Sequence, residues 1–303
     1  MWARLDSNQR ATSYEPAALP LSYRPGPASV RRRWGFVLPP PQNRTVVDID
    51  RYLSRIAYTG DRRPSLATLV ALQRAHLEAV PFENIHVIAR RPLALEEPAL
   101  FAKVVEGRRG GICYELNSLF AALLRALGFA PDLVSATVCR PDGTWTAPFD
   151  HLTLVVPIAG QRWLTDVGFG RGFGAPIALP DGTVDGYRLT PAGDEFVLEE
   201  WGGTEWKPLY RFADRAHPFA AFHDRARWHQ TAPEAPFTQT LVCTLAQPGG
   251  RITLAGDTLT RTLGGTKTVT PVASADERQT ILFEIFGIAD PTPGEAVTPN
   301  SSV

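Results

Sequence analysis

The chain has 303 residues, of which 44% are hydrophobic and 20% are charged, so it is long enough for two domains, or one large domain with a lid, with ordinary globular cores. Its 31 basic and 31 acidic residues give a formal net charge of zero, which excludes the basic surface of a general nucleic-acid binder. We expect no nucleic-acid partner, and no membrane partner because the sequence lacks an apolar run of about 18 residues.

The cysteines indicate a reducing compartment. Cys113, Cys139 and Cys243 are an odd set without a pairing pattern, so a disulfide framework is not expected. The polar N-terminus lacks the apolar segment of a signal peptide. We therefore expect a cytoplasmic protein.

Residues 1–45 differ from the rest of the chain. They are rich in proline, contain the run Arg31–Arg33 and show no apolar periodicity. Such a segment cannot bury enough surface to offset the entropy of ordering it. We expect a disordered or loosely attached extension over 1–45, whose presence in the native protein the sequence leaves open, and a flexible tail over 291–303.

Helical periodicity begins near Val47. Apolar residues from Ile49 to Ile56 recur at helical spacing, Ser65 can cap a second helix, and residues 97–106 allow a third. A fourth helix should begin at about Cys113 and end near Gly128, a residue suited to close a helix. These segments predict a small helical bundle.

After Pro131 the pattern becomes that of strands. Short β-rich runs separated by glycine and proline lie at 132–140, 151–158, 161–169, 187–193, 195–200, 237–246, 251–262 and 266–272. A helix is expected from Asp276 to Phe286. Helices followed by antiparallel strands favour an α+β fold over a doubly wound sheet.

Cys113 stands just after the pair Gly110–Gly111, at the expected start of a helix. The thiolate is the reactive form of cysteine, and a free thiol with a pKa of about 8.5 is mostly protonated at neutral pH. Unpaired N–H groups at a helix start stabilise an anion and can form an oxyanion hole. We expect the glycines to let a substrate carbonyl approach. A buried structural cysteine would also fit this stretch.

His151 and Asp166 lie in two apolar runs that predict a hairpin. With a four-residue loop at 157–160, Val156 would face Gln161, and His151 would lie directly opposite Asp166. The carboxylate could then fix the tautomer of the imidazole, which would activate a thiol. The alternative is a histidine that merely begins a strand and an aspartate in a turn.

Two further features are weaker signals. The other histidines do not match metal-ligand spacing, so we expect no metal. The run from Gly168 to Gly174 contains Arg171 between flexible glycines and could hold a phosphate, although a mobile loop explains it equally well.

Four motifs together resemble the arylamine N-acetyltransferases. They are PFENI at 81–85, RGGICYELN at 109–117, His151 before an apolar strand, and DVGFG at 166–170, and the match covers about residues 47–290. The resemblance implies a helical bundle over 46–130, a central antiparallel β-barrel over 131–233 and an α/β lid over 234–290. A cysteine-protease-like Cys-His-Asp core would lie between the first two.

The resemblance also implies a ping-pong reaction. Cys113 would take an acetyl group from acetyl-CoA as a thioester and pass it to the nitrogen of an arylamine, arylhydrazine or N-hydroxyarylamine. His151 would move the proton, and Asp166 would orient the imidazole of His151. The implied supporting residues are Arg109, Glu83 and Gly111. The implied acceptor-pocket and CoA contacts are Phe82, Phe169, Gly170, Arg171 and Phe173. We expect a monomer or weak homo-oligomer.

One stretch departs from the family pattern, which has a Ser/Thr-Thr-His-Pro-like segment before a phenylalanine. Here the sequence is WHQTAPEAPF, from Trp228 to Phe237, with displaced histidine and proline. The acceptor and the acyl donor are therefore open. An amide synthase using another thioester, a thiol hydrolase or transglutaminase-like enzyme, and a binding module with an inert cysteine are the alternatives.

Overall fold

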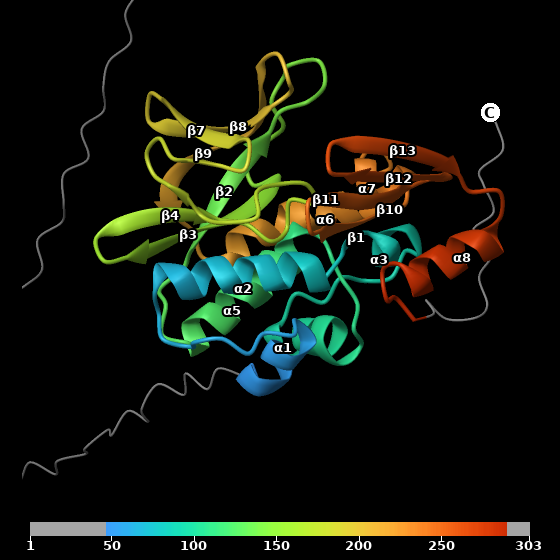
Figure 1. Cartoon of the computed structure of the whole chain (residues 1–303), viewed down its shortest axis with the longest axis horizontal. Coiled ribbons are helices and arrows are strands. Elements are labelled where there is room, and N and C mark those ends of the chain that lie inside the picture. The colour runs from blue at the N-terminus through green and yellow to red at the C-terminus, as the bar shows by residue number, and fades with distance from the viewer. Residues whose placement is uncertain (1–46, 290–303) are drawn as a thin grey trace, which may run out of the picture. The chain divides into compact units, whose positions relative to one another are not determined.

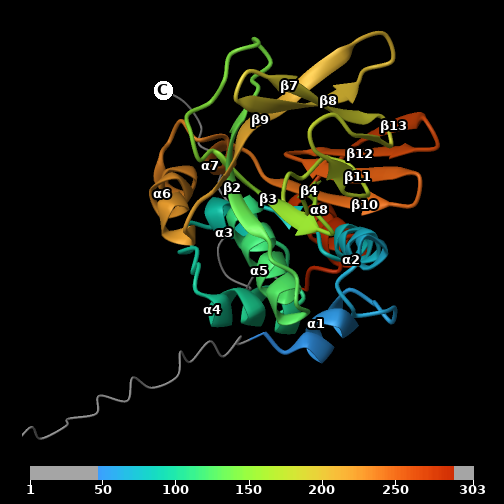
Figure 2. The same cartoon turned by 90° about the vertical axis from the view of Figure 1, so that its left-hand side faces the viewer.

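The computed structural model describes residues 47–289 (Figures 1 and 2). The expectations for residues 1–45 and 291–303 lie outside this range. No helix within residues 47–289 is long and apolar enough to cross a membrane.

The N-terminal third of the described chain is helical, as predicted. Its elements are α1 (Ile49–Arg55), α2 (Leu66–Ala79), α3 (Ile85–Ile88), α4 (Glu97–Phe101), the π-helix η1 (Ala102–Glu106) and α5 (Cys113–Ala126). Ser65 caps α2, since its hydroxyl accepts a hydrogen bond from the Thr68 N–H. Gly128 follows α5 with a φ of 89°, the conformation expected of a closing glycine. The short helix α3 was not predicted.

The central region is an eight-stranded antiparallel sheet that closes almost into a barrel. Its strands, in spatial order, are β5 (Ile177–Ala178), β4 (Gln161–Thr165), β3 (His151–Ile158), β2 (Asp132–Val138), β9 (Trp206–Ala216), β8 (Glu195–Trp201), β7 (Tyr187–Ala192) and β6 (Thr183–Val184). The two edge strands, β5 and β6, approach each other, because they are joined by a short turn in which the Gly182 N–H donates to the carbonyl of Ala178 at the end of β5, at 2.8 Å. The protein therefore has a mixed α/β fold with a nearly closed barrel.

A second sheet has five strands. Its order is β1 (Phe82–Glu83), β10 (Val242–Gln247), β11 (Gly250–Ala255), β12 (Thr258–Leu263) and β13 (Thr266–Pro271). Strand β1 belongs to the helical part of the sequence but pairs with β10. Figure 1 shows this sheet beside α3, with the expected last helix, α8 (Ala275–Glu284), close by.

The strand expected over 237–246 was wrong in its first half. Residues Pro236–Gln239 form the short helix α7, and β10 begins only at Val242. Proline fits the first turn of a helix because it lacks the N–H that would be unpaired there. The 3-10 helix η2 (Phe219–Phe222) and the helix α6 (His223–Thr231) precede α7.

Strand β3 separates two hydrophobic cores. Leu152 and Leu154 pack with the buried face of α5, whereas Val155 packs inside the barrel with Leu164. The alternation of side chains along a strand produces this division. The five-stranded sheet has its own core, which includes Cys243 and Ile281. His151 therefore begins a strand that both the helices and the barrel hold in place.

Candidate active site

Cys113 is the first residue of α5, as predicted, and is 3% exposed. The Ile112 N–H just before it donates to the Glu115 carboxylate at 3.0 Å, which satisfies one of the unpaired donors at the helix start. Glu115 is in turn paired with the Lys103 ammonium at 2.7 Å. Glu115 and Lys103 thus fix the conformation of the first turn of α5, which carries Cys113.

The two glycines before Cys113 have another role than the one expected. A Cβ on Gly110 would lie 1.9 Å from the Pro81 carbonyl oxygen, and one on Gly111 would lie 2.7 Å from the Glu115 carboxylate. The Glu83 N–H donates to the Gly111 carbonyl at 3.0 Å. The expectation that they make room for a substrate carbonyl was wrong, because the protein itself fills that space.

The β3–β4 hairpin has a tighter turn than predicted. Ile158 pairs with Gln161, so the loop is the two residues Ala159 and Gly160, both with positive φ. Continued by one residue, this register puts Asp166 across from Thr153. His151 is therefore a diagonal neighbour of Asp166 on the same face, and the expected direct pairing was wrong by two residues.

The imidazole of His151 nevertheless reaches Asp166. Its Nε2 lies 2.6 Å from Oδ2 of Asp166, and both side chains are almost fully buried. The second nitrogen, Nδ1, is not engaged by Asp166, and Cys113 is the other side chain that acts on the imidazole. Burial alone would lower the pKa of His151, but the Asp166 charge, its hydrogen bond and the contact with Cys113 raise it from 6.5 to about 10. The three predicted residues are thus brought together.

Asp166 is fixed by residues that the sequence interpretation missed. Asn117 Nδ2 donates to Oδ1 at 2.9 Å, the Gly168 N–H donates to the same oxygen at 2.9 Å, and the Tyr210 hydroxyl donates to Oδ2 at 3.0 Å. Burial raises the pKa of Asp166, but His151, Asn117 and the Gly168 N–H bring it below its usual value. Asn117 was detectable, because it lies four residues after Cys113 on one helical face.

Arg109 and Glu83 form a buried ion pair at 2.9 Å. Glu83 also accepts the Ile85 N–H at 2.7 Å. Burial raises the pKa of Glu83, but Lys103 and Arg109 lower it below its ordinary value. The pair joins β1 to the segment that enters α5.

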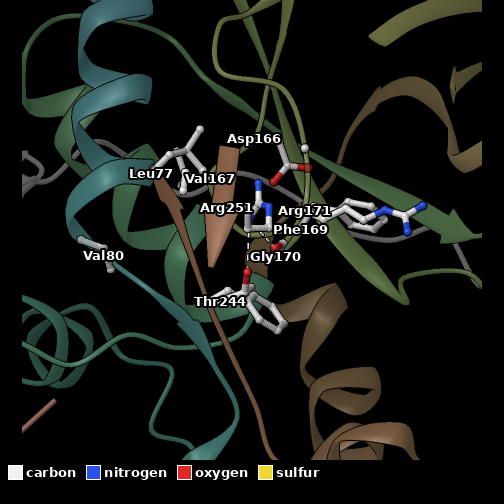
Figure 3. A pocket seen from close by; sticks show the side chains of 12 residues that line it. Leu77, Val80, Asp166, Val167, Phe169, Gly170, Arg171, Thr244 and Arg251 are labelled. Atoms are coloured by element: carbon white, nitrogen blue, oxygen red, sulfur yellow. Dashed lines mark hydrogen bonds between the residues drawn. The ribbon is translucent and has the colours of Figure 1, made fainter. Parts of the chain in front are cut away.

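A small pocket opens beside Asp166 (Figure 3). Four of the five residues expected to contact the acceptor or CoA line this pocket, namely Phe82, Phe169, Gly170 and Arg171. Phe173 does not: its side chain is 1% exposed and packs in the barrel core, so it has no open surface to offer a ligand.

The pocket lining also includes Arg251 on β11, which the sequence interpretation missed. Its Nη1 donates to the Gly170 carbonyl at 2.5 Å (Figure 3). Arg171, by contrast, is 57% exposed and lies 3.4 Å from Glu200. Phe169 connects the pocket to the buried site, because its ring centroid lies 5.0 Å from that of His151.

The segment Trp228–Phe237, whose sequence differs from the family pattern, forms the end of α6, a loop and the start of α7. The ring of Phe237 lies 5.7 Å from that of Phe82, so the segment supports the pocket from behind. Within residues 47–289, no cluster of three or more His, Cys, Asp or Glu side chains could hold a metal ion. The three cysteines are free thiols.

Comparisons with known proteins agree on one group. A family model described as N-acetyltransferase matches residues 65–291. An arylamine N-acetyltransferase of Mycolicibacterium smegmatis is 37% identical over 224 residues, covering 70% of this chain and 82% of the relative. One from Escherichia coli K12 is 32% identical over 213 residues, covering 68% of this chain and 76% of the relative.

Solved structures give the same result. The Mycobacterium marinum arylamine N-acetyltransferase in complex with CoA matches with a TM-score of 0.75 and 32% identity, over 80% of this chain and 93% of the other. The Salmonella typhimurium enzyme matches with a TM-score of 0.77 and 28% identity, over 82% and 94%.

Proposed function

Since the chain belongs to the arylamine N-acetyltransferase family, we propose that it transfers an acetyl group from acetyl-CoA to the nitrogen of an arylamine or arylhydrazine. The observation that carries the proposal is the placement of the His151 imidazole between Cys113 and the Asp166 carboxylate. A thiol beside an oriented imidazole is the arrangement that activates a cysteine nucleophile.

In the first half-reaction, Sγ of Cys113 attacks the carbonyl carbon of the thioester as a thiolate. The bond between that carbon and the CoA sulfur breaks, and CoA leaves as its thiol after taking the proton that His151 carries. Asp166 stabilises the imidazolium before this transfer. The raised pKa of His151 supports this role, because the imidazole is then already protonated at neutral pH.

In the second half-reaction, the amine nitrogen attacks the acetyl carbon on Cys113. His151 accepts the proton that the nitrogen loses, the carbon–Sγ bond breaks, and the thiolate–imidazolium pair is restored. The sum is acetyl-CoA plus amine giving amide plus CoA. No other reactant is needed.

The pocket beside the triad supports an assignment of substrate sides. Flat acceptor rings would pack on Phe82 and Phe169, which line it. Gly170 and Arg171 would lie on the CoA side, where a guanidinium suits phosphate. CoA is bound in the matching Mycobacterium marinum structure, which supports CoA as the carrier here.

The remaining organisation is proposed on the same premise. The bundle would span 46–130, the barrel 131–233 and the lid 234–290, although β1 pairs with β10 across the first and last of these. Free thiols support a cytoplasmic location. We propose a monomer or weak homo-oligomer.

The test is product formation. The protein, acetyl-CoA and an arylamine should give the N-acetyl product, with parallel lines in double-reciprocal plots as expected for a ping-pong reaction. Cys113→Ser should abolish the product. If the amine is acylated only from other acyl thioesters, the amide synthase is the better description, and if no thioester is consumed with any arylhydrazine, the proposal fails.

A further inference from the structure

Resting on the proposed function, we propose that Tyr114, Asp150 and His229 are positioning residues that fix the spacing between Cys113 and His151. Tyr114 directly follows the cysteine in the chain, and Asp150 directly precedes the histidine. The three side chains are buried beside the site, but the acetyl-transfer steps do not use them.

The hydroxyl of Tyr114 joins the two elements that carry the reacting groups. It donates to the carbonyls of Phe149 and Asp150 at 2.8 and 3.0 Å. Burial raises the pKa of Tyr114 far above its ordinary value, with Cys113 and Asp150 adding to the effect, so the hydroxyl keeps its proton. The first turn of α5 is thereby tied to the entry of β3.

The entry of β3 needs such support. Phe149 has a φ of 64°, a backbone conformation that residues with a side chain rarely adopt. Its N–H donates to the Ser135 hydroxyl at 2.9 Å, while its carbonyl accepts from Tyr114. Strained residues of this kind persist where the surroundings hold them, and they cluster at functional sites.

The carboxylate of Asp150 anchors the same point to α6. Its Oδ1 lies 2.9 Å from Nε2 of His229 and accepts from Nε of Arg225 at 2.7 Å. Burial would raise the pKa of Asp150, but these two partners lower it to about 2, so the carboxylate stays charged. Asp150 directly precedes His151 in the chain, so a fixed Asp150 carboxylate fixes the backbone from which the imidazole projects.

His229 connects this anchor to the pocket wall. Its ring centroid lies 5.9 Å from that of Tyr114 and 5.0 Å from that of Phe237, which in turn contacts Phe82. His229, the histidine of the segment that differs from the family pattern, is therefore buried, and it holds α6 against the start of β3.

The test is the reactivity of Cys113 toward iodoacetamide at neutral pH, followed by peptide mass spectrometry. Tyr114→Phe should slow this alkylation roughly tenfold, because small misplacements of reacting groups have large effects on rate. The matched control is Tyr52→Phe, which removes a buried hydroxyl lying 3.0 Å from His76 Nδ1 in the same helical core. The control should stay within about twofold of the unmodified protein.

A second pair of variants separates positioning from loss of packing. His229→Leu removes one of the two partners of the Asp150 carboxylate and should give a similar fall, whereas His229→Gln keeps a donor and should recover most of the rate. In steady-state acetyl transfer, Tyr114→Phe should lower kcat by the same factor and leave KM within about twofold.

These outcomes distinguish the two proposals. Alkylation of folded Tyr114→Phe and His229→Leu at the rate of the Tyr52→Phe control would overturn the positioning role. A slowed alkylation in these variants would support it even if the unmodified protein transferred no acetyl group, in which case only the proposed function would fail.

Discussion

Asp166 meets His151 Nε2 with one carboxylate oxygen, at 2.6 Å, while Asn117 Nδ2 holds its other oxygen at 2.9 Å. Both oxygens are therefore committed, and the carboxylate cannot rotate without losing a charge-assisted hydrogen bond. Asn117 lies one turn after Cys113 on α5. The same helix therefore carries the nucleophile and one of the side chains that orient the imidazole through Asp166.

Asp166→Asn should lower kcat by roughly a thousand- to ten-thousandfold. The amide can donate to Nε2, which would move the imidazole proton to Nδ1, the nitrogen that faces Cys113. Acetyl-transfer kinetics measure the effect, and Asp142→Asn on an exposed turn serves as the control. Retention of more than about a tenth of the activity would contradict the orienting role.

Asn117→Ala should destabilise the protein by about 3 kcal/mol. It would remove one hydrogen bond each from the Leu152 carbonyl, the Val167 N–H and the Asp166 carboxylate, of which Asp166 keeps its bonds from Gly168 and Tyr210. A buried group left unpaired costs about 1–3 kcal/mol. Urea unfolding measures this loss. The exposed Thr280→Ala should change stability by less than about 0.5 kcal/mol, and an equal effect in both variants would refute the role of Asn117.

The free energy of unfolding should fall between pH 6.5 and 10 because of His151. Its pKa is raised to about 10 in the folded protein, against about 6.5 in the unfolded chain. The stabilisation is therefore complete below pH 6.5 and is lost as the pH rises through about 10. Urea unfolding at several pH values should show that the advantage over His151→Gln shrinks across this window. A constant or growing difference would contradict the raised pKa.

Gly110→Ala should disrupt the site through the backbone. Its Cβ would stand 1.9 Å from the Pro81 carbonyl, so β1 or the start of α5 must move. We expect a lower melting temperature and strongly reduced activity. Gly172→Ala is the matched control, because its Cβ would meet no atom within 4 Å. Similar melting temperatures for the two variants would show that the close approach does not matter.

The elements with strong local patterns were predictable from the sequence. Strand β3 was expected over the residues it occupies, and α5 begins at Cys113 as expected. Strand β9 was missed, although it pairs with both β2 and β8. Pro208 and the charged residues near its end conceal its alternation, and only the pairing partners on both sides make it a strand.

The contacts of the site depended on tertiary structure. The diagonal contact between His151 and Asp166 survived a wrong loop length because a shift of two residues keeps a side chain on its face. Local sequence could not show that Pro81 fills the space beside Gly110, since β1 reaches that point through pairing with β10. The burial of Phe173 inside the barrel was hidden for the same reason.

The most direct test of the central claim is the intact mass of the protein after incubation with acetyl-CoA alone. We predict a gain of one acetyl group, located on Cys113 by peptide mapping, absent in Cys113→Ala and discharged when an arylamine is added. A protein that releases CoA without forming this adduct, or that carries the acetyl group on another residue, would contradict the assignment of Cys113 as the nucleophile.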